Sequence, residues 1–125
     1  MAGERILVVD DEVDIIDLLR DVLVAEGYVV DGAPDAGAAL RLIRENIYDV
    51  ALVDFNLPDM NGVMLHHQIR QIDTELAAGT IFMSGLLQSD DNLGYYIAQS
   101  GGFLAKPFDI GDVLRQVRSV LGETP

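Results

Sequence analysis

The sequence predicts an α/β fold in which helices cover both faces of a parallel sheet of five strands. Two features carry this prediction. Short apolar runs alternate five times with longer segments in which apolar residues recur at helical spacing. The short runs are apolar at nearly every position, as expected for strands that are buried on both faces. Alternation of this kind favours right-handed crossovers and therefore a doubly wound (βα)5 domain.

Five runs are predicted as strands because they are short and rich in β-branched or aromatic residues. They cover residues 6–9, 28–30, 50–53, 80–83 and 103–105. Because these runs have almost no polar positions, neither face of the sheet is expected to meet solvent. The segments between the strands must therefore supply apolar helix faces to both sides of the sheet.

Helical spacing of apolar residues is clear in four segments, which cover residues 15–23, 36–43, 65–72 and 110–121. Gly27 follows the first segment as a stop signal, and Asp109 precedes the last as a candidate N-cap. A fifth segment, residues 89–100, is the weakest helix because it contains Gly94 and few apolar side chains. We expect one domain over residues 1–125, with no output domain after it.

Charge and composition exclude several functions. The formal net charge is −13, and such a surface repels nucleic acid and anionic membranes. Cysteine is absent, which excludes disulfides, thiol catalysis and zinc–thiolate sites. No apolar run is long enough to span a bilayer. We therefore expect a cytoplasmic protein that binds no nucleic acid and is not inserted in a membrane.

Polar residues gather where the predicted strands end, which is the edge at which open parallel sheets bind ligands. They are Asp10, Asp11, Glu12, Asp54, Ser84 and Lys106, the last being the only lysine in the sequence. If the first and third strands are neighbours, Asp10, Asp11 and Asp54 converge. Two unit charges about 4 Å apart repel by roughly 1 kcal/mol in water and about 4 kcal/mol at an effective dielectric near 20. Such a cluster either raises a pKa or binds a cation, and oxygen ligands favour Mg²⁺.

Asp54 is the candidate nucleophile of this cluster, because a carboxylate that attacks a phosphoryl group forms an acyl phosphate. Its transition state needs charge stabilisation, which Mg²⁺, Lys106 and the Ser84 hydroxyl could each supply. A simpler interpretation of the first acidic run stays open. Asp11 or Glu12 could serve only to cap the helix that follows.

Four motifs resemble those of bacterial response regulator receiver domains, in the same order and at similar spacing over essentially the whole chain. They read ILVVDDE at residues 6–12, DFNLPDMNG at 54–62, IFMSG at 81–85 and FLAKPF at 103–108. The resemblance implies a flavodoxin-like fold with sheet order 2-1-3-4-5. It also implies a chain that takes a phosphoryl group from a histidine kinase or a histidine phosphotransfer protein. Such a domain catalyses only its own phosphorylation and dephosphorylation, and it is a monomer or a weak dimer.

The resemblance also assigns roles to individual residues. Asp54 matches the phosphoacceptor, Ser84 the switch hydroxyl, Phe103 the switch aromatic and Lys106 the phosphate-binding lysine. The Mg²⁺ ligands that it implies are Asp10, Asp11, Asp54 and the backbone carbonyl of Asn56. Phosphorylation would change the face formed by residues 89–100, the last strand and the last helix. The bond between Lys106 and Pro107 is expected to be cis.

Some positions depart from the commonest receiver pattern. Gly85 follows Ser84 where alanine is usual, and Phe103 lacks the hydroxyl that a tyrosine would bring. Gly101-Gly102 stands where many DNA-binding regulators carry acidic residues, which weakens the expectation of their charged dimer face. Together with the polar segment at 89–100, these features resemble the receivers that are attached to hybrid sensor kinases.

Three other functions compete with this prediction. A Mg²⁺-dependent hydrolase with an aspartyl-phosphate intermediate needs a D-x-D motif, which Asp54-Phe55-Asn56 breaks, and usually a cap domain. A flavin carrier of similar topology needs a first loop that cradles phosphate, whereas the acidic run at residues 10–12 repels it. A non-phosphorylated interaction module would not need the full set of polar strand ends.

His66 and His67 are interpreted as solvent-exposed helix residues.

Overall fold

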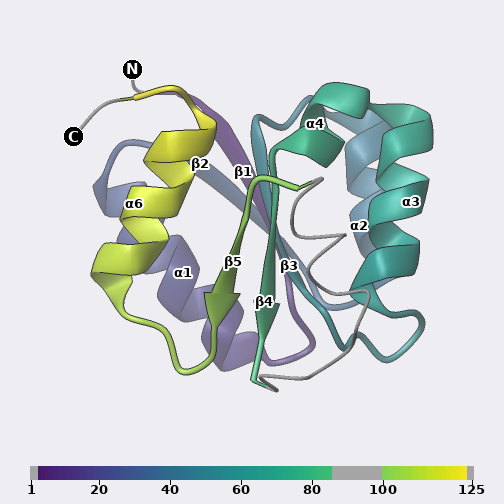
Figure 1. The fold of residues 1–125 in the computed structure, drawn as a ribbon, viewed down its shortest axis with the longest axis horizontal. Coiled ribbons are helices and arrows are strands. Elements are labelled where there is room, and N and C mark those ends of the chain that lie inside the picture. The colour runs from purple at the N-terminus through teal and green to yellow at the C-terminus, as the bar shows by residue number, and fades with distance from the viewer. Residues whose placement is uncertain (1–2, 86–99, 124–125) are drawn as a thin grey trace.

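Five parallel strands form one sheet in the order β2-β1-β3-β4-β5, as the sequence predicted, in a computed structural model that describes residues 3–85 and 100–123 (Figure 1). The strands are β1 Arg5–Val9, β2 Val29–Ala33, β3 Val50–Asp54, β4 Thr80–Ser84 and β5 Gly102–Ala105. The largest difference from the predicted strands is in β2, which continues through Asp31 and Gly32. These polar or small residues pair with Leu7 and Val8 of β1 at the edge of the sheet.

Helices cover both faces of the sheet, which confirms the predicted doubly wound fold (Figure 1). The described helices are α1 Val13–Ala25, α2 Ala36–Glu45, α3 Gly62–Ile72, α4 Thr74–Ala78 and α6 Ile110–Val120. Helices α1 and α6 lie on one face, and α2, α3 and α4 lie on the other. Each layer seals a separate apolar core, because alternate residues of the buried strands point to opposite faces. In β1, for example, Ile6 and Val8 belong to one core and Leu7 and Val9 to the other.

Side-chain caps fix the starts of the helices after β2, β3 and β5. Asp35 accepts a hydrogen bond from the amide of Ala38 at the start of α2, and Asn61 accepts one from Met64 at the start of α3. Asp109, the predicted cap, accepts one from Gly111 at the start of α6. These caps satisfy backbone amides that have no partner inside the helix.

The prediction that His66 is exposed is wrong, whereas His67 is exposed as predicted. The His66 side chain lies between α3 and the short helix α4, and its Nε2 is 2.8 Å from the Ala77 carbonyl oxygen. Its ring also meets the edge of the Phe82 ring at a centroid distance of 5.4 Å. The short helix α4, which was not predicted at residues 74–78, covers this side of α3. The Ala77 carbonyl of α4 and the Phe82 ring of β4 together enclose the imidazole.

The predicted helix at residues 89–100 falls almost entirely outside the described residues. Within the described part of the chain, no helix is both long and apolar enough to cross a bilayer.

Candidate functional site

The carboxyl edge of the sheet brings together the polar strand ends that the sequence identified. Strands β1, β3, β4 and β5 are consecutive neighbours, and their register places Val9 beside Val53, Asp54 beside Met83 and Ser84 beside Ala105. The residues at or just after these positions are Asp10, Asp11, Asp54, Ser84 and Lys106. They therefore lie along one edge although they are up to 96 positions apart in sequence.

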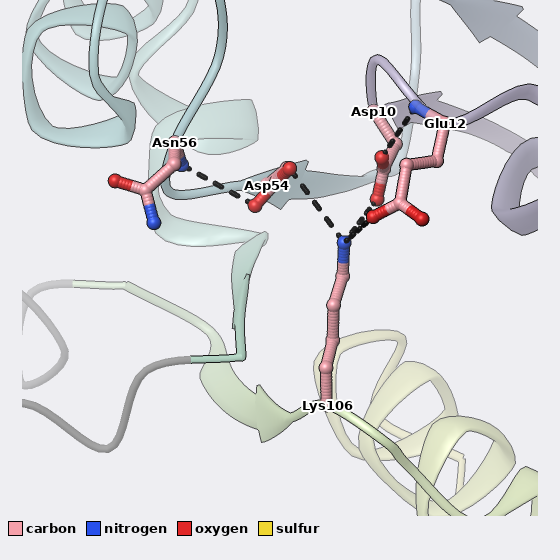
Figure 2. A network of polar contacts seen from close by, with 5 residues as sticks. All are labelled: Asp10, Glu12, Asp54, Asn56 and Lys106. Carbon is pink, nitrogen blue, oxygen red and sulfur yellow. Dashed lines mark hydrogen bonds and ion pairs between the residues drawn. The ribbon is translucent and has the colours of Figure 1, made fainter.

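Lys106 is the centre of a charged cluster (Figure 2). Its Nζ atom lies 2.6 Å from Asp10 Oδ2, 3.6 Å from Asp54 Oδ2 and 3.7 Å from Glu12 Oε1. The Asp10 side chain is fully buried, whereas the Asp54 and Lys106 side chains are 8% and 14% exposed. One ammonium group thus faces three carboxylates, two of which are shielded from water. This excess of negative charge is what a bound cation would neutralise.

Asp10, Asp11 and Glu12 form a second grouping within this cluster. One carboxylate oxygen from each lies within 4.8 Å of the others. The Glu12 amide donates a 2.9 Å hydrogen bond to Asp10 Oδ1, which fixes the turn after β1. Hard oxygen ligands of this kind fit a divalent cation such as Mg²⁺. Glu12 was counted among the polar strand ends and considered as a helix cap, but was given no role at the site; its side chain makes no capping bond and faces Lys106. Its place in the run Asp10-Asp11-Glu12 is the signal that could have identified it.

The pKa of Asp54 is raised above its ordinary value, chiefly because burial disfavours the carboxylate. The negative charges of Asp10 and Asp11 raise it further, while the Asn56 amide and Lys106 act in the opposite direction. Burial alone would lower the pKa of Lys106, but its hydrogen bond to Asp10 and the nearby carboxylates raise it. Lys106 is therefore held in its charged form beside Asp54.

The loop after β3 is tightly closed. The Asn56 amide donates a 3.3 Å hydrogen bond to Asp54 Oδ1, and Asn56 pairs with Asn61 in an isolated antiparallel bridge. The Gly62 amide donates to the Phe55 carbonyl at 2.7 Å. A Cβ atom on Gly62 would lie 2.9 Å from the Phe55 Cα, so only glycine allows this approach. The peptide groups next to Asp54 are consequently held in a defined place.

The remaining predicted residues lie at the ends of β4 and β5. Ser84 is 3% exposed, and its carbonyl accepts a 2.8 Å hydrogen bond from the Lys106 amide. The peptide bond between Lys106 and Pro107 is cis, as predicted. Phe103 is partly buried, and its carbonyl accepts a hydrogen bond from the Gln116 side chain of α6.

A surface hollow of about 550 Å³ lies away from this cluster. It is bordered by the loop before β3, helix α4 and the end of α6, and its lining includes Tyr48, Leu76, Gly79 and Val120. None of the predicted site residues lines it. The chemistry of the strand ends, rather than this hollow, therefore identifies the candidate site.

Comparison with known proteins places these features in a family. The sequence model of the response regulator receiver domain family matches residues 6–118 of this chain. The chain is 31% identical over 121 residues to the transcriptional regulatory protein PrrA of Mycobacterium tuberculosis, and the match covers 97% of this chain and 51% of PrrA. It is likewise 31% identical over 121 residues to the response regulator ArlR of Staphylococcus epidermidis, covering 97% of this chain and 54% of ArlR. The chain thus spans about half the length of the curated relatives it matches.

Solved structures agree with this placement. A receiver domain protein from Methanospirillum hungatei superposes with a TM-score of 0.88 at 29% identity, covering 97% of this chain and 95% of that one. The response regulator TrrA of Thermotoga maritima, solved in complex with Mg²⁺–BeF, gives a TM-score of 0.82 at 26% identity, covering 94% and 98%. In this family an aspartate accepts a phosphoryl group, and Mg²⁺ is generally bound. The family match over residues 6–118 and the shared fold show that this chain belongs to the response regulator receiver domains of two-component signalling.

Proposed function

We propose that Asp54 is the phosphoacceptor of this receiver domain. The observation that carries the proposal is the placement of Lys106 Nζ 3.6 Å from Asp54 Oδ2, in a buried cluster with more carboxylates than cations. Asp10 and Asp11, with Asp54 and the Asn56 backbone carbonyl, would hold Mg²⁺. The closeness of the Asp10 and Asp11 carboxylate oxygens, within 4.8 Å of one another, and the excess of carboxylates around Lys106 support this assignment. When bound, the ion would supply positive charge for the oxygens of the phosphoryl group.

The reaction would transfer a phosphoryl group from a phosphohistidine to Asp54. An Asp54 carboxylate oxygen forms the new bond to phosphorus, the phosphorus–nitrogen bond breaks, and its electron pair returns to the imidazole. Lys106 would stabilise the charge on one phosphoryl oxygen and the Ser84 hydroxyl would donate to another. The donor would be a histidine kinase or a phosphotransfer protein in the cytoplasm. This chain would then catalyse only its own phosphorylation and dephosphorylation.

Ser84 and Phe103 would convert phosphorylation into a change of surface. Movement of Ser84 towards the phosphoryl group would leave space into which the Phe103 ring could turn. The affected surface would be the one that includes β5 and α6. A phosphoryl group shifts such an equilibrium only as far as it binds the two conformations differently.

The test is to incubate the chain with Mg²⁺ and acetyl phosphate, or with a phosphorylated histidine kinase, and to measure intact mass. We expect one added phosphoryl group on the wild type and none on Asp54→Asn. Ser84→Ala keeps the acceptor carboxylate and loses only one hydrogen bond to the phosphoryl group, so it should still be labelled at Asp54, although more slowly. Equal labelling of Asp54→Asn would move the acceptor elsewhere. A wild type that takes no label from either donor would instead favour a non-phosphorylated interaction module.

A further inference from the structure

Asp59 links the loop after the phosphoacceptor to a helix that precedes it by more than twenty residues. Its Oδ1 atom accepts a 3.0 Å hydrogen bond from the Ala36 amide, and its Oδ2 atom accepts a 2.9 Å hydrogen bond from the Gly37 amide. These amides are the first two of α2. They also hold the pKa of Asp59 below its usual range, so the side chain is a carboxylate at neutral pH.

Helix α2 does not depend on Asp59 alone for its cap. Asp35, its N-cap residue, accepts a 2.7 Å hydrogen bond from the Ala38 amide. Two carboxylates therefore share the first turn of α2, each bonded to different amides. Asp35 belongs to the helix, whereas Asp59 brings the loop of residues 55–61 with it. Substitutions of Asp35 and Asp59 can therefore distinguish the loss of a helix cap from the loss of the attachment between the loop and the helix.

The loop that Asp59 holds is also the one that carries Asn56. Near its ends it is closed by the Asn56–Asn61 bridge and by the hydrogen bond from Gly62 to Phe55. Asp59 lies between these closures and attaches the middle of the loop to α2 through two hydrogen bonds. With both closures and this attachment, the loop has little freedom to move the Asn56 peptide relative to Asp54.

The geometry points to Asp59 as a positioning residue for the magnesium and phosphoryl site, which acts by fixing the Asn56 backbone through its two hydrogen bonds to α2. This inference rests on the proposed function, because it needs the Asn56 carbonyl to be a metal ligand. Outer partners that orient metal ligands typically affect metal affinity by about 10–100-fold. Asp59 acts through a loop rather than on a ligand side chain, so we expect an effect near the lower end, about tenfold.

Three variants of the 125-residue chain test this inference. Asp59→Ala removes both hydrogen bonds, and Asp59→Asn removes the charge but keeps a side-chain oxygen that can accept one of them. Asp35→Ala is the matched control, since it removes a carboxylate cap from the same helix turn without touching the loop. For each variant, Mg²⁺ binding is measured by calorimetry without a phosphodonor. The Mg²⁺ dependence of Asp54 labelling by acetyl phosphate and the urea midpoint are measured alongside.

We expect Asp59→Ala to weaken Mg²⁺ binding about tenfold and to raise the Mg²⁺ concentration for half-maximal labelling by a similar factor. Asp59→Asn should fall between Asp59→Ala and the wild type. Asp35→Ala should lower the urea midpoint about as much as Asp59→Ala but leave Mg²⁺ binding within about twofold of the wild type.

Unchanged Mg²⁺ binding in Asp59→Ala would overturn the inference and leave Asp59 as a helix cap. Equal weakening in Asp59→Asn and Asp59→Ala would overturn it in favour of a simple charge effect, and equal weakening in Asp35→Ala would do so in favour of general loosening of α2. A wild type that neither binds Mg²⁺ nor becomes labelled would contradict the proposed function itself, which is a different result from all of these.

Discussion

Strand β1 has a charged cluster at each end, and the two clusters are built on opposite principles. At its start, Arg5 NH2 lies 3.0 Å from Asp31 Oδ2, and the Tyr48 hydroxyl donates a 2.6 Å hydrogen bond to the same oxygen. Beyond its other end, Lys106 faces three carboxylates. The first cluster pairs one cation with one carboxylate and adds a neutral donor. Among the described residues, the second sets one ammonium group against three carboxylates.

The pKa values follow this difference. The Tyr48 hydrogen bond and the Arg5 charge lower the pKa of Asp31, although burial opposes them. Burial and the Asp31 carboxylate in turn raise the pKa of the Tyr48 hydroxyl. The pKa of Asp54 is instead raised, with burial as the main cause. A balanced cluster therefore stabilises its own carboxylate, whereas the unbalanced one gains stability when a further cation arrives.

The largest expected effect comes from removing the cation of each cluster. Without Mg²⁺, Lys106→Met should lower the free energy of unfolding by about 3–5 kcal/mol, because it leaves the buried Asp10 carboxylate unpaired. Arg5→Met should cost about 1 kcal/mol, since the Arg5 side chain is 38% exposed. Urea unfolding with and without saturating Mg²⁺ checks the comparison. Mg²⁺ should restore much of the lost unfolding free energy in Lys106→Met and none in Arg5→Met. Equal recovery in both variants would contradict the proposed difference between the two clusters.

The next effect concerns the neutral donor of the balanced cluster. Tyr48→Phe removes the hydrogen bond to the Asp31 carboxylate while keeping the buried ring, so unfolding should become easier by about 1.5–3 kcal/mol. Labelling of Asp54 by acetyl phosphate should stay at the wild-type rate, because this cluster lies at the opposite end of the sheet. A slower labelling rate in a fully folded Tyr48→Phe would show that the two ends are coupled.

A smaller effect is expected from substitution of Asp54, and here the free energy of unfolding should rise rather than fall. Its pKa is raised in the folded chain, so ionisation costs stability as the pH rises from the ordinary value of 3.8 through the folded pKa. Without Mg²⁺, Asp54→Asn removes that cost and should be more stable than the wild type at neutral pH. Urea midpoints measured across this pH range provide the check. The gap between the two proteins should widen as the pH rises, and a gap that is constant with pH would refute the explanation.

The smallest effect is the pH dependence of stability that Asp31 contributes, which has the opposite sign to that of Asp54. The folded pKa of Asp31 is lowered, so its contribution is fully present above the ordinary value of 3.8 and is lost as the pH falls through the folded pKa. The side chain is 34% exposed, which limits the contribution to about 1 kcal/mol or less. Acid titration of the wild type and Asp31→Asn, followed by circular dichroism, should show the wild type losing its advantage below pH 3.8. An advantage that survives to the lowest pH would contradict this account.

Sequence patterns were sufficient for much of the fold and for the composition of the site. Apolar runs of the right length identified all five strands. The predicted burial on both faces holds for β1, β3 and β4, whereas the edge strands β2 and β5 are only partly buried. The polar residues after those runs identified Asp10, Asp54 and Lys106 as neighbours, because the carboxyl ends of parallel strands meet at one edge. Both inferences needed only local composition and the direction of the strands.

Tertiary structure decided what depends on packing between distant segments. The burial of His66 depends on its contacts with α4 and β4, and the link from Asp59 to α2 joins residues 22 and 23 positions apart. Neither feature changes the spacing of apolar residues along the chain, which is the signal used to predict helices and strands. The distances from Lys106 Nζ to the carboxylates of Asp10, Glu12 and Asp54 likewise leave no signal in the sequence. The sequence by itself thus determined which groups form the site, while the folded packing determined their pairing and the direction of the Asp54 pKa, because burial and Coulomb energies depend on the three-dimensional surroundings of each charge.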